Sequence, residues 1–310
     1  MCSFSIGKRK IGMGNPAFIV AEIGANHNGD IELAKKTIEA AFKCGVDAVK
    51  FQTYTGKELV ADYDRIITWG EEGKQKSEKI GEMFDRLSLP RKSYKELFQY
   101  ANSLGLIAFS SPFSLDGLKF LLKELDMCCI KIAASDVNYP DLLIQSAMSG
   151  KPVMLSLGKC TLAEADIAIL ILLENGCVNL VIMHCVSQYP TPIEEMNLRV
   201  IEGLNQLYPE CIIGFSDHSM GITAALGAVV LGAKVIEKHF TLDKSLTGPD
   251  HWFSMDPDDM SLLVHEVRNI ESALGHPRKR VLKCEEDERC KSIRSISLAK
   301  DIKLGETITE

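Results

Sequence analysis

The sequence lacks the features of proteins that bind nucleic acids or lie in membranes. It has 35 lysines and arginines against 42 aspartates and glutamates, a formal net charge of −7, and no basic stretch with interleaved aromatic residues. Residues 1–10 lack the apolar core of a secretory signal, and the longest apolar stretch, at 224–233, is too short and too rich in glycine to span a bilayer. We therefore predict a cytoplasmic protein that acts on a small molecule, with neither a nucleic acid nor a membrane as partner.

The cysteines also lack an organising pattern. All ten are scattered without CxxC pairs, and several lie inside apolar runs, as buried thiols do in reducing compartments. The chain has 310 residues, of which 46% are hydrophobic and 25% charged. This composition predicts one large globular domain, or one domain with a fragment of another.

The sequence does contain a repeated alternation of β-prone and amphipathic segments. Strand-like runs recur mostly at intervals of about 25 to 30 residues, the size of a βα unit. The segments between them, such as 31–44 and 162–174, place apolar residues three to four apart, as helices do. Eight such units over about 240 residues predict an α/β fold, a (β/α)₈ TIM barrel. The eight predicted strands are 18–24, 47–53, 106–111, 128–135, 152–158, 180–186, 211–218 and 235–241.

The segments outside this repeat define the expected domains. Residues 4–13 predict an N-terminal β-hairpin that plugs the bottom of the barrel, and residues 54–90 predict an elaborated loop on the active-site face. Residues 276–291 are charged and have no core pattern, which predicts a linker after a barrel domain over 1–275. Residues 292–310 alternate as short strands do, but they are too few to bury a core of their own, so we expect only the beginning of a second domain.

Polar and ionisable residues gather where the predicted strands end, the end at which α/β barrels bind ligands. Because side chains alternate along a strand, Ser216 and His218 share one face, and so do Glu237 and His239. Two imidazoles and a carboxylate could therefore meet there, which predicts a site for a divalent metal and a reacting carbonyl. An isolated lysine, glutamate or serine is more often structural, but recurrence at the same end of eight strands favours a functional site.

Two inward-facing lysines predict that the site holds an anion. Lys50 and Lys131 can balance the charge of a phosphate, while Ser111, Ser156 and Ser216 donate hydroxyl groups to it. The competing interpretation is that one lysine forms an imine with the substrate. Two cations with surrounding hydroxyls exceed what imine chemistry needs, so phosphate binding is favoured.

Longer motifs resemble one family throughout the barrel. In chain order they are AEIGANHNGD, DAVKFQTY, FSSPFS, KIAASDVNYP, MHCVSQYPTP, GFSDHS, EKHFTLD and GPDHWFSMDP. From Phe18 to Pro257 the chain resembles the sialic acid synthases, which make nonulosonic acids and phosphate from phosphoenolpyruvate, water and an N-acetylated hexosamine such as N-acetylmannosamine. The resemblance implies a TIM-barrel transferase followed by an antifreeze-like (SAF) domain, of which 292–310 is an incomplete beginning. It also implies a homodimer in which the complete SAF domain covers the barrel mouth of the partner subunit, so without that domain we expect phosphoenolpyruvate binding but weak turnover.

The resemblance further implies a role for each matching residue. His218 and His239 would bind a divalent metal, manganese ahead of magnesium or cobalt, that polarises the sugar aldehyde. Asp136 would take the proton of the attacking water, in a place where the family commonly has a glutamate, and Glu22 and Lys131 would join it in catalysis. The residues expected to bind the two substrates are Lys50, Gln52, Ser111, Ser156 and Ser216, with Tyr189 and Asp250 against the sugar.

Two alternatives come from other functional classes. The first is a lysine-imine aldolase on the same barrel, which borohydride would trap. The second is a non-catalytic sugar-binding barrel whose chemistry has decayed, an interpretation that draws on departures from the family pattern at Ala134, Asp136 and Ser187. Hexosamine-dependent release of phosphate from phosphoenolpyruvate separates both from a synthase.

Overall fold

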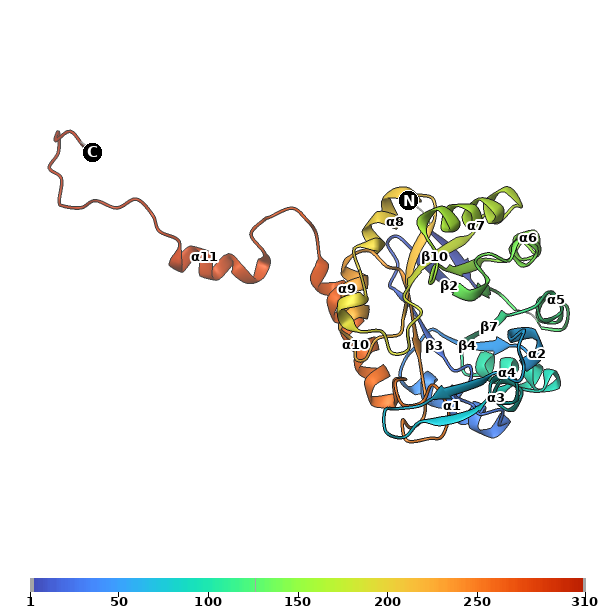
Figure 1. The fold of residues 1–310 in the computed structure, drawn as a ribbon. Helices are drawn as coiled ribbons and strands as arrows, with labels where there is room; N and C mark the ends of the chain where they lie inside the picture. The colour runs from blue at the N-terminus through green and yellow to red at the C-terminus, as the bar shows by residue number, and fades with distance from the viewer. Residues whose placement is uncertain (1–2, 126, 309–310) are drawn as a thin grey trace. The chain divides into compact units, whose positions relative to one another are not determined.

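Eight parallel strands form a closed barrel, as the sequence predicts. The computed structural model describes residues 3–125 and 127–308, and the chain divides into two units, residues 1–273 and 274–310. In the first unit each barrel strand pairs with the next one along the chain, and the last pairs with the first (Figure 1). The barrel strands are β3 (Phe18–Glu22), β4 (Ala48–Thr53), β7 (Ile107–Pro112), β8 (Ile130–Ile132), β9 (Val153–Ser156), β10 (Leu180–Cys185), β11 (Ile212–Asp217) and β12 (Val235–His239).

Amphipathic helices cover the outside of the barrel. In α1 (Ile31–Lys43), Ala34, Ile38 and Ala41 recur on one face and are fully buried, while Asp30 caps the helix by accepting hydrogen bonds from two backbone N–H groups of its first turn. A long helix also follows the last barrel strand. The other covering helices are α4 (Arg91–Ser103), α5 (Leu115–Glu124), α6 (Pro140–Met148), α7 (Leu162–Glu174), α8 (Val200–Leu207), α9 (Thr223–Val230) and α10 (Pro257–Leu274).

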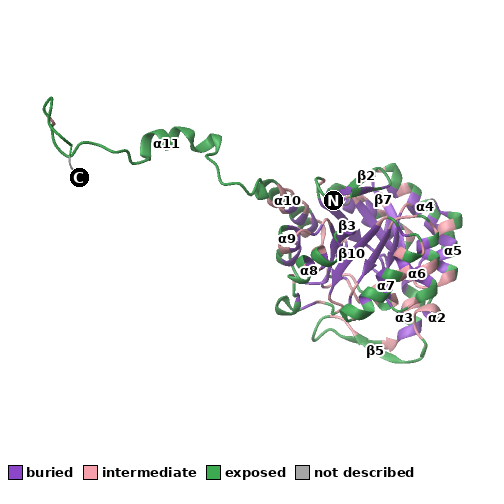
Figure 2. Cartoon of the chain, turned by 90° about the horizontal axis from the view of Figure 1, so that it is seen from above, coloured by how far each residue is buried: buried purple, intermediate pink, exposed green. Residues whose placement is uncertain are grey.

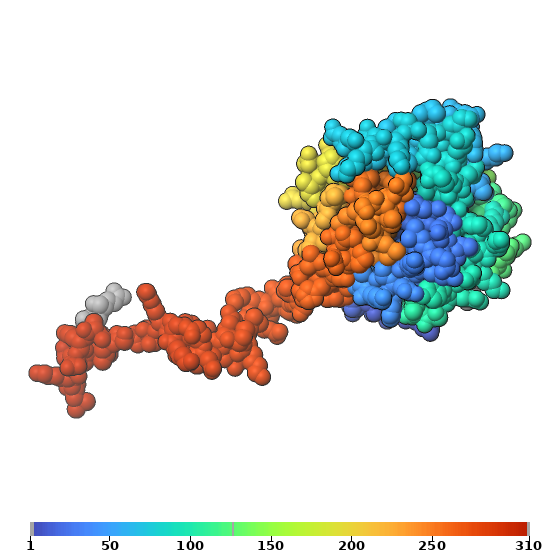
Figure 3. Space-filling view, turned by 90° about the horizontal axis from the view of Figure 1, so that it is seen from below, coloured from blue at the N-terminus to red at the C-terminus, as the bar shows by residue number. Residues whose placement is uncertain are grey.

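The barrel closes between its first and last strands. β12 pairs with β3 in parallel, with a register that runs from Val235 opposite Phe18 to His239 opposite Glu22. The next pair of neighbours, β3 and β4, sets Glu22 opposite Lys50. Figure 3 shows the orange surface that follows β12 beside the blue surface of the first βα unit. Residues from both ends of the unit therefore meet at the carboxyl ends of the strands.

The N-terminal hairpin lies at the opposite end of the barrel, as expected. β1 (Ser3–Ile6) and β2 (Arg9–Gly12) pair antiparallel, and the side chains of Ile6 and Ile11 are fully buried. The turn needs Gly7, whose φ of +54° is unfavourable for other residues and whose Cα faces Ile107 at the start of β7. The hairpin thus covers the amino ends of the strands.

An ion-paired group, here called the floor cluster, ties this amino end together and consists of Arg9, Asp47, Arg268 and Glu271. Arg9 Nε lies 3.1 Å from Asp47 Oδ1, and Arg268 Nη2 lies 3.4 Å from Asp47 Oδ2. Arg268 Nη1 also lies 2.8 Å from Glu271 Oε2 and donates a hydrogen bond of 2.9 Å to the carbonyl oxygen of Ala17. The cluster therefore joins the hairpin, two barrel strands and α10.

The long segment after β4 is more ordered than the predicted loop. It contains α2 (Gly56–Leu59), an antiparallel pair formed by β5 (Ile66–Trp69) and β6 (Lys76–Lys79), and α3 (Ile80–Leu87). The α3 side chains Ile80, Met83 and Leu87 pack with Ala25 in a small core separate from that of the barrel. The sequence predicts an elaborated segment here but not its individual elements, because these are too short to give a strong periodic pattern.

The second unit, residues 274–310, is exposed along nearly all of its described length (Figure 2). It forms a 3₁₀ turn at Lys283–Glu285 and the helix α11 (Glu286–Ser292), in and just after the segment for which the sequence predicts a linker. Residues 293–308 contain no strand, so the short strands predicted there are not formed, and the prediction for 309–310 lies outside the described residues. Ile296 and Leu304 are fully exposed, because alternating residues without a partner strand or a core have nothing to pack against.

Two predictions from composition concern the described residues as a whole. Seven of the described cysteines, Cys44, Cys129, Cys160, Cys177, Cys185, Cys284 and Cys290, are free thiols, and Cys2 lies outside the described residues. Among residues 3–125 and 127–308, no helix is both long enough and apolar enough to cross a membrane.

Candidate active site

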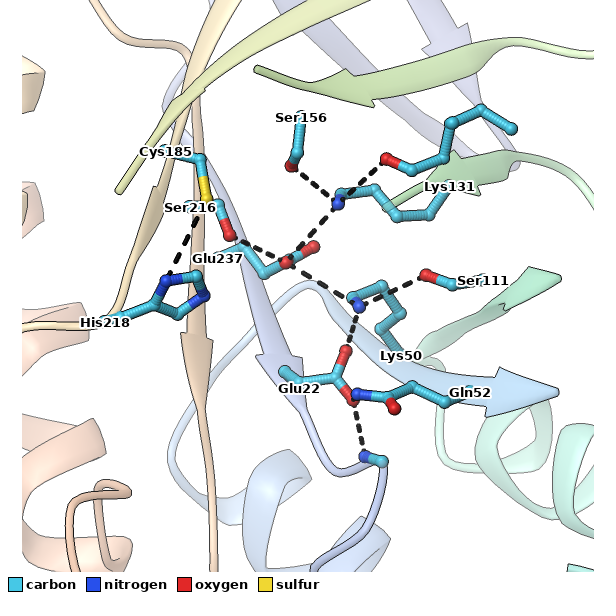
Figure 4. Close-up of polar contacts among 12 residues, drawn as sticks. Glu22, Lys50, Gln52, Ser111, Lys131, Ser156, Cys185, Ser216, His218 and Glu237 are labelled. Atoms are coloured by element: carbon cyan, nitrogen blue, oxygen red, sulfur yellow. Dashed lines mark hydrogen bonds and ion pairs between the residues drawn. The ribbon is translucent and has the colours of Figure 1, made fainter. Parts of the chain in front are cut away.

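The carboxyl ends of the barrel strands surround a polar cavity of about 150 Å³. Nine of the twelve site residues predicted from the sequence line this cavity, and Figure 4 shows how several of them point toward one another. The nine are Lys50, Gln52, Ser111, Lys131, Ser156, Tyr189, Ser216, His218 and His239. The structure places the other three, Glu22, Asp136 and Asp250, around its margin.

Four charged side chains, here called the rim cluster, form a buried network beside the cavity: Glu22, Lys50, Lys131 and Glu237. Glu237 Oε1 lies 3.7 Å from Lys50 Nζ and 3.8 Å from Lys131 Nζ, and Lys50 is also ion-paired with Glu22. The side chains are at most 6% exposed. Their formal charges cancel, which lowers the cost of burying them together.

Burial and pairing act differently on the two lysines. Burial opposes the charged form of Lys50, but attraction to Glu22 and Glu237 outweighs it and raises the pKa of this lysine. At Lys131 burial prevails over attraction to Glu237, and the pKa is lowered. Although burial opposes it, attraction to Lys131 and Lys50 lowers the pKa of Glu237. Lys50 is therefore the more firmly held cation.

Glu22 is fixed beside Lys50 and does not itself line the cavity. Its Oε1 accepts hydrogen bonds of 2.6 Å from the backbone N–H of Gly24 and 3.3 Å from Gln52 Nε2. A side chain at Gly24 would not fit, because its Cβ would lie 2.3 Å from this same oxygen. The close approach of the backbone holds the carboxylate against Lys50.

The three serines that are predicted to bind phosphate each form a hydrogen bond with a member of the rim cluster. Lys50 Nζ donates to Ser111 Oγ at 3.4 Å, and Lys131 Nζ donates to Ser156 Oγ at 2.7 Å. Ser216 Oγ instead donates to Glu237 Oε1 at 3.0 Å. Because the first two hydroxyls accept from lysine, their own hydrogens remain available to a ligand.

The two histidines predicted to bind metal lie side by side, with ring centroids 5.5 Å apart. His218 Nδ1 lies 2.7 Å from the carbonyl oxygen of Val186, so it carries the proton and donates, which leaves the lone pair on Nε2. Burial, and then proximity to His239, lowers the pKa of His218 to about 3, so the ring is neutral near pH 7. A neutral imidazole is the form that binds a metal.

The donor set fits a divalent ion held by two protein ligands. His239 Nδ1 is buried and has no hydrogen-bond partner in the described part of the chain. Across residues 3–125 and 127–308, no group of three or more histidine, cysteine or acidic side chains is placed to hold a metal. Water and a substrate oxygen would therefore complete the coordination of an ion at His218 and His239. Glu237, expected from its strand to accompany the imidazoles, lies between the lysines.

Aromatic and acidic side chains flank the histidines where the sugar is expected. The Tyr189 ring lies against His218, with centroids 4.1 Å apart, and Phe253 lies 5.5 Å from His239. Asp250 Oδ2 is 3.4 Å from His239 Nδ1. The structure thus places Tyr189 inside the cavity and Asp250 at its margin, both next to the imidazoles.

Asp136 lies in a 3₁₀ turn, Ala134–Asp136, that follows the short strand β8. Ser135 lines the cavity and its Oγ lies 3.5 Å from Asp136 Oδ2, whereas Asp136 does not line the cavity. Burial raises the pKa of Asp136 to about 6, against the opposing effects of Ser135 and Lys131. This carboxyl group is poised to exchange a proton near neutral pH.

Eight further residues line the cavity but were not among the predicted site residues, and three of them, Phe113, Lys159 and Cys185, had no part in the sequence prediction. Phe113 and Cys185 lie within motifs that carry the family resemblance, so the motifs could have identified them. Lys159 lies outside those motifs, in the loop after β9, and its positive φ of 61° is a conformation that the sequence does not reveal.

Comparison with known proteins gives the same picture over nearly the whole chain. The sequence profile of the NeuB family matches residues 37–279. The N,N'-diacetyllegionaminic acid synthase of Campylobacter jejuni is 37% identical over 94% of this chain and 87% of its own, and the N-acetylneuraminate-9-phosphate synthase of Mus musculus is 36% identical over 97% and 83%. The crystal structure of N-acetylneuraminic acid synthetase from Leptospira borgpetersenii matches with a TM-score of 0.82 and 33% identity, over 95% of this chain and 98% of that one.

The barrel, its rim and these relatives define an enzyme that condenses phosphoenolpyruvate with a second substrate. The chain belongs to the NeuB family, and its activity is that of a nonulosonic acid synthase. This confirms the family predicted from the motifs, and it sets aside both the lysine-imine aldolase and the non-catalytic barrel.

Proposed function

We propose that the enzyme condenses phosphoenolpyruvate with an N-acetylated hexosamine, N-acetylmannosamine or a related sugar, and with water, to give a sialic-type acid and phosphate. The observation that carries the proposal is one cavity with two buried lysines and serine hydroxyls on one side and paired imidazoles on the other. An anionic leaving group and an aldehyde oxygen need these two different surroundings in one cavity, because the enol carbon of phosphoenolpyruvate must reach the aldehyde carbon.

The lysine side of the cavity is proposed to hold phosphoenolpyruvate. Lys50 and Lys131 supply positive charge where the phosphate leaves, and Ser111 and Ser156 have hydroxyl hydrogens free to donate to its oxygens. Ser216 must first release Glu237 before it can donate to a ligand. Lys131 and Ser156 are therefore expected to contribute more to binding than Ser216.

The imidazole side is proposed to hold the sugar. A divalent ion bound by His218 and His239, manganese ahead of magnesium or cobalt, would polarise the sugar aldehyde. Tyr189 packs against His218 and so fixes the ring in the plane that its hydrogen bond to Val186 sets. Asp250, next to His239, is placed to accept a hydrogen bond from a sugar hydroxyl.

The proton of the attacking water is proposed to pass to Asp136. With a pKa of about 6 this carboxyl group is mostly ionised at pH 7 and can accept a proton there. Because Ser135 and not Asp136 lines the cavity, we expect a bridging water between the carboxylate and the reacting water.

The choice of sugar is the property to test first. Relatives of nearly equal identity are named as synthases of different acids: legionaminic at 37%, pseudaminic at 38% and N-acetylneuraminate-9-phosphate at 36%. The enzyme should be incubated with phosphoenolpyruvate, Mn²⁺ and each of three aldoses: N-acetylmannosamine, its 6-phosphate and a di-N-acetylated trideoxyhexose. Mass spectrometry of the products and release of phosphate are measured. Phosphate release that needs no aldose, or no product with any of the three, would contradict the proposal.

A further inference from the structure

A second buried ion pair lies directly next to the two histidines in the sequence. Lys238 Nζ is 2.9 Å from Asp217 Oδ2, and both residues are at most 3% exposed. The β11–β12 register sets Asp217 opposite Lys238, one position before His218 and His239. Since side chains alternate along a strand, the ion pair faces away from the side on which the histidines lie.

The same ion pair also holds the backbone just after His218. Asp217 Oδ1 accepts hydrogen bonds from Ser219, at 2.8 Å from its backbone N–H and 2.7 Å from its hydroxyl group. Lys238 Nζ donates to the carbonyl oxygen of Ser219 at 2.5 Å. His218 therefore lies between two residues that are tied to one lysine, and that lysine immediately precedes His239.

Burial of this ion pair costs free energy and is not the most effective way to stabilise the fold. A buried lysine and aspartate lose their hydration, and a well-packed apolar pair of similar volume is often as stable or more stable. The neighbouring outward-facing pair in the same register, Phe215 and Ile236, is apolar and fully buried. The outward-facing pair thus changes from apolar to charged at the register position directly before His218 and His239.

We propose that Asp217, Lys238 and Ser219, here called the histidine clamp, are positioning residues that set the separation of the two imidazoles and hence the affinity for a divalent ion. The inference rests on the proposed function for the assignment of His218 and His239 as metal ligands. None of the three clamp residues touches the ion or a substrate.

The test is the affinity of the purified enzyme for Mn²⁺, measured by titration calorimetry. The double variant Asp217→Asn with Lys238→Met removes both charges together and so leaves no unpaired buried ion. Loss of outer partners of metal ligands commonly weakens metal binding by about 10- to 100-fold, and we expect a loss of that size here. Phosphoenolpyruvate affinity, measured in the presence of a chelator, should not change, because the lysines that hold it are on other strands.

The matched control is Lys244→Met, which removes ion pairs with Asp256 and Asp259 a few residues after His239 without touching the clamp. It should bind Mn²⁺ as the unmodified enzyme does. A double variant that melts as a folded protein and binds Mn²⁺ with unchanged affinity overturns the inference.

A milder variant decides the case if the double variant does not fold. Ser219→Ala removes one hydrogen bond to Asp217 and keeps the ion pair, and we expect measurably weaker Mn²⁺ binding at full stability. Unchanged affinity in this variant contradicts the clamp. If His218→Ala binds Mn²⁺ as tightly as the unmodified enzyme, the proposed metal site itself is wrong, which is a different result from failure of the clamp alone.

Discussion

The two ends of the barrel each carry two cations and two carboxylates, but in very different surroundings. At the amino end, the floor cluster uses arginines, and Arg9 and Arg268 are 38% and 32% exposed. At the carboxyl end, the rim cluster uses lysines, and Lys50 and Lys131 are 5% and 3% exposed. The partners differ as well, because Arg268 donates to a backbone carbonyl whereas the lysines donate to serine hydroxyls beside a cavity.

This difference shows why equal charge content does not mean equal function. An arginine presents a fixed planar set of donors that suits a permanent bond between segments, whereas a lysine is a compact charge that can exchange one partner for another. The rim cluster is the more deeply buried and hence the more costly. A buried, exchangeable set of charges beside a cavity is what binding of an anion requires, while the floor cluster serves the closure of the barrel.

The largest effect on metal binding and turnover should come from substitution of His218 or His239. His218→Ala or His239→Ala should weaken Mn²⁺ binding by about 100-fold or more and reduce turnover to near background, since each removes one of the two proposed protein ligands. Calorimetry with Mn²⁺ and a phosphate-release assay measure the two effects. His265→Ala, on the exposed surface of α10, is the control and should remain close to the unmodified enzyme. Full activity with bound metal in both histidine variants would contradict the assignment of the metal site.

Lys131→Met sharpens the contrast between the ends. Loss of one positioned donor to developing charge costs about 100- to 1000-fold in rate, so kcat/KM for phosphoenolpyruvate should fall by that order. The melting temperature should fall only moderately, because the cluster then carries one uncompensated negative charge but Glu237 keeps Lys50 as a partner. Steady-state kinetics and thermal melts measure both. A large loss of stability at unchanged kcat/KM would make the rim cluster resemble the floor cluster instead.

Asp136→Asn tests the margin of the cavity. We expect turnover to fall by about 100-fold, the lower range for loss of a general base, with phosphoenolpyruvate binding retained. Because burial raises the pKa of Asp136 to about 6, the unmodified enzyme should lose activity as the pH falls through 6 and this carboxylate becomes protonated. A pH–rate profile of the two proteins measures this. An acidic limb that persists unchanged in the variant would assign the base to another group.

Arg268→Met at the floor should have the smallest effect on chemistry. It removes ion pairs with Asp47 and Glu271 and a hydrogen bond to Ala17, all partly solvated, so we expect a loss of about 1 to 2 kcal/mol in the free energy of unfolding. The kcat should not change. Denaturant unfolding and phosphate release provide the measurements. An altered kcat at saturating substrate would contradict the assignment of a purely structural role to the floor cluster.

The barrel and most of its rim could be predicted from the sequence because both follow from local periodicity. Strand spacing identifies the eight units, alternation predicts which side chains share a strand face, and position late in each strand places Lys50, Ser216 and His239 at the same end. Pairing across the barrel is a different matter. The position of Glu237 between two lysines depends on strands that are distant in the sequence, so its own strand suggested only the histidines as neighbours.

Local departures from regular structure account for the remaining differences. The sequence predicts a strand over 128–135 that leads directly to Asp136, but β8 ends at Ile132 and a 3₁₀ turn carries Asp136 to the margin of the cavity. In residues 293–308 the opposite occurs, since regular structure is predicted and not formed. Alternation over 293–308 predicts strands, yet a strand is stable only against other strands or a core, which this segment does not have within its own unit.

Pairing of β12 with β3 has a consequence for the order in which the protein acquires its ligand site. Glu22 and Lys50 are synthesised early, whereas Glu237 and His239 leave the ribosome roughly ten seconds or more later at ordinary elongation rates. A nascent chain that has not yet made its final strand thus presents only part of the cavity lining. After β12 has paired with β3, a ligand that contacts residues of both strands opposes their separation. Substrate in the cell should therefore protect this strand pair from local unfolding.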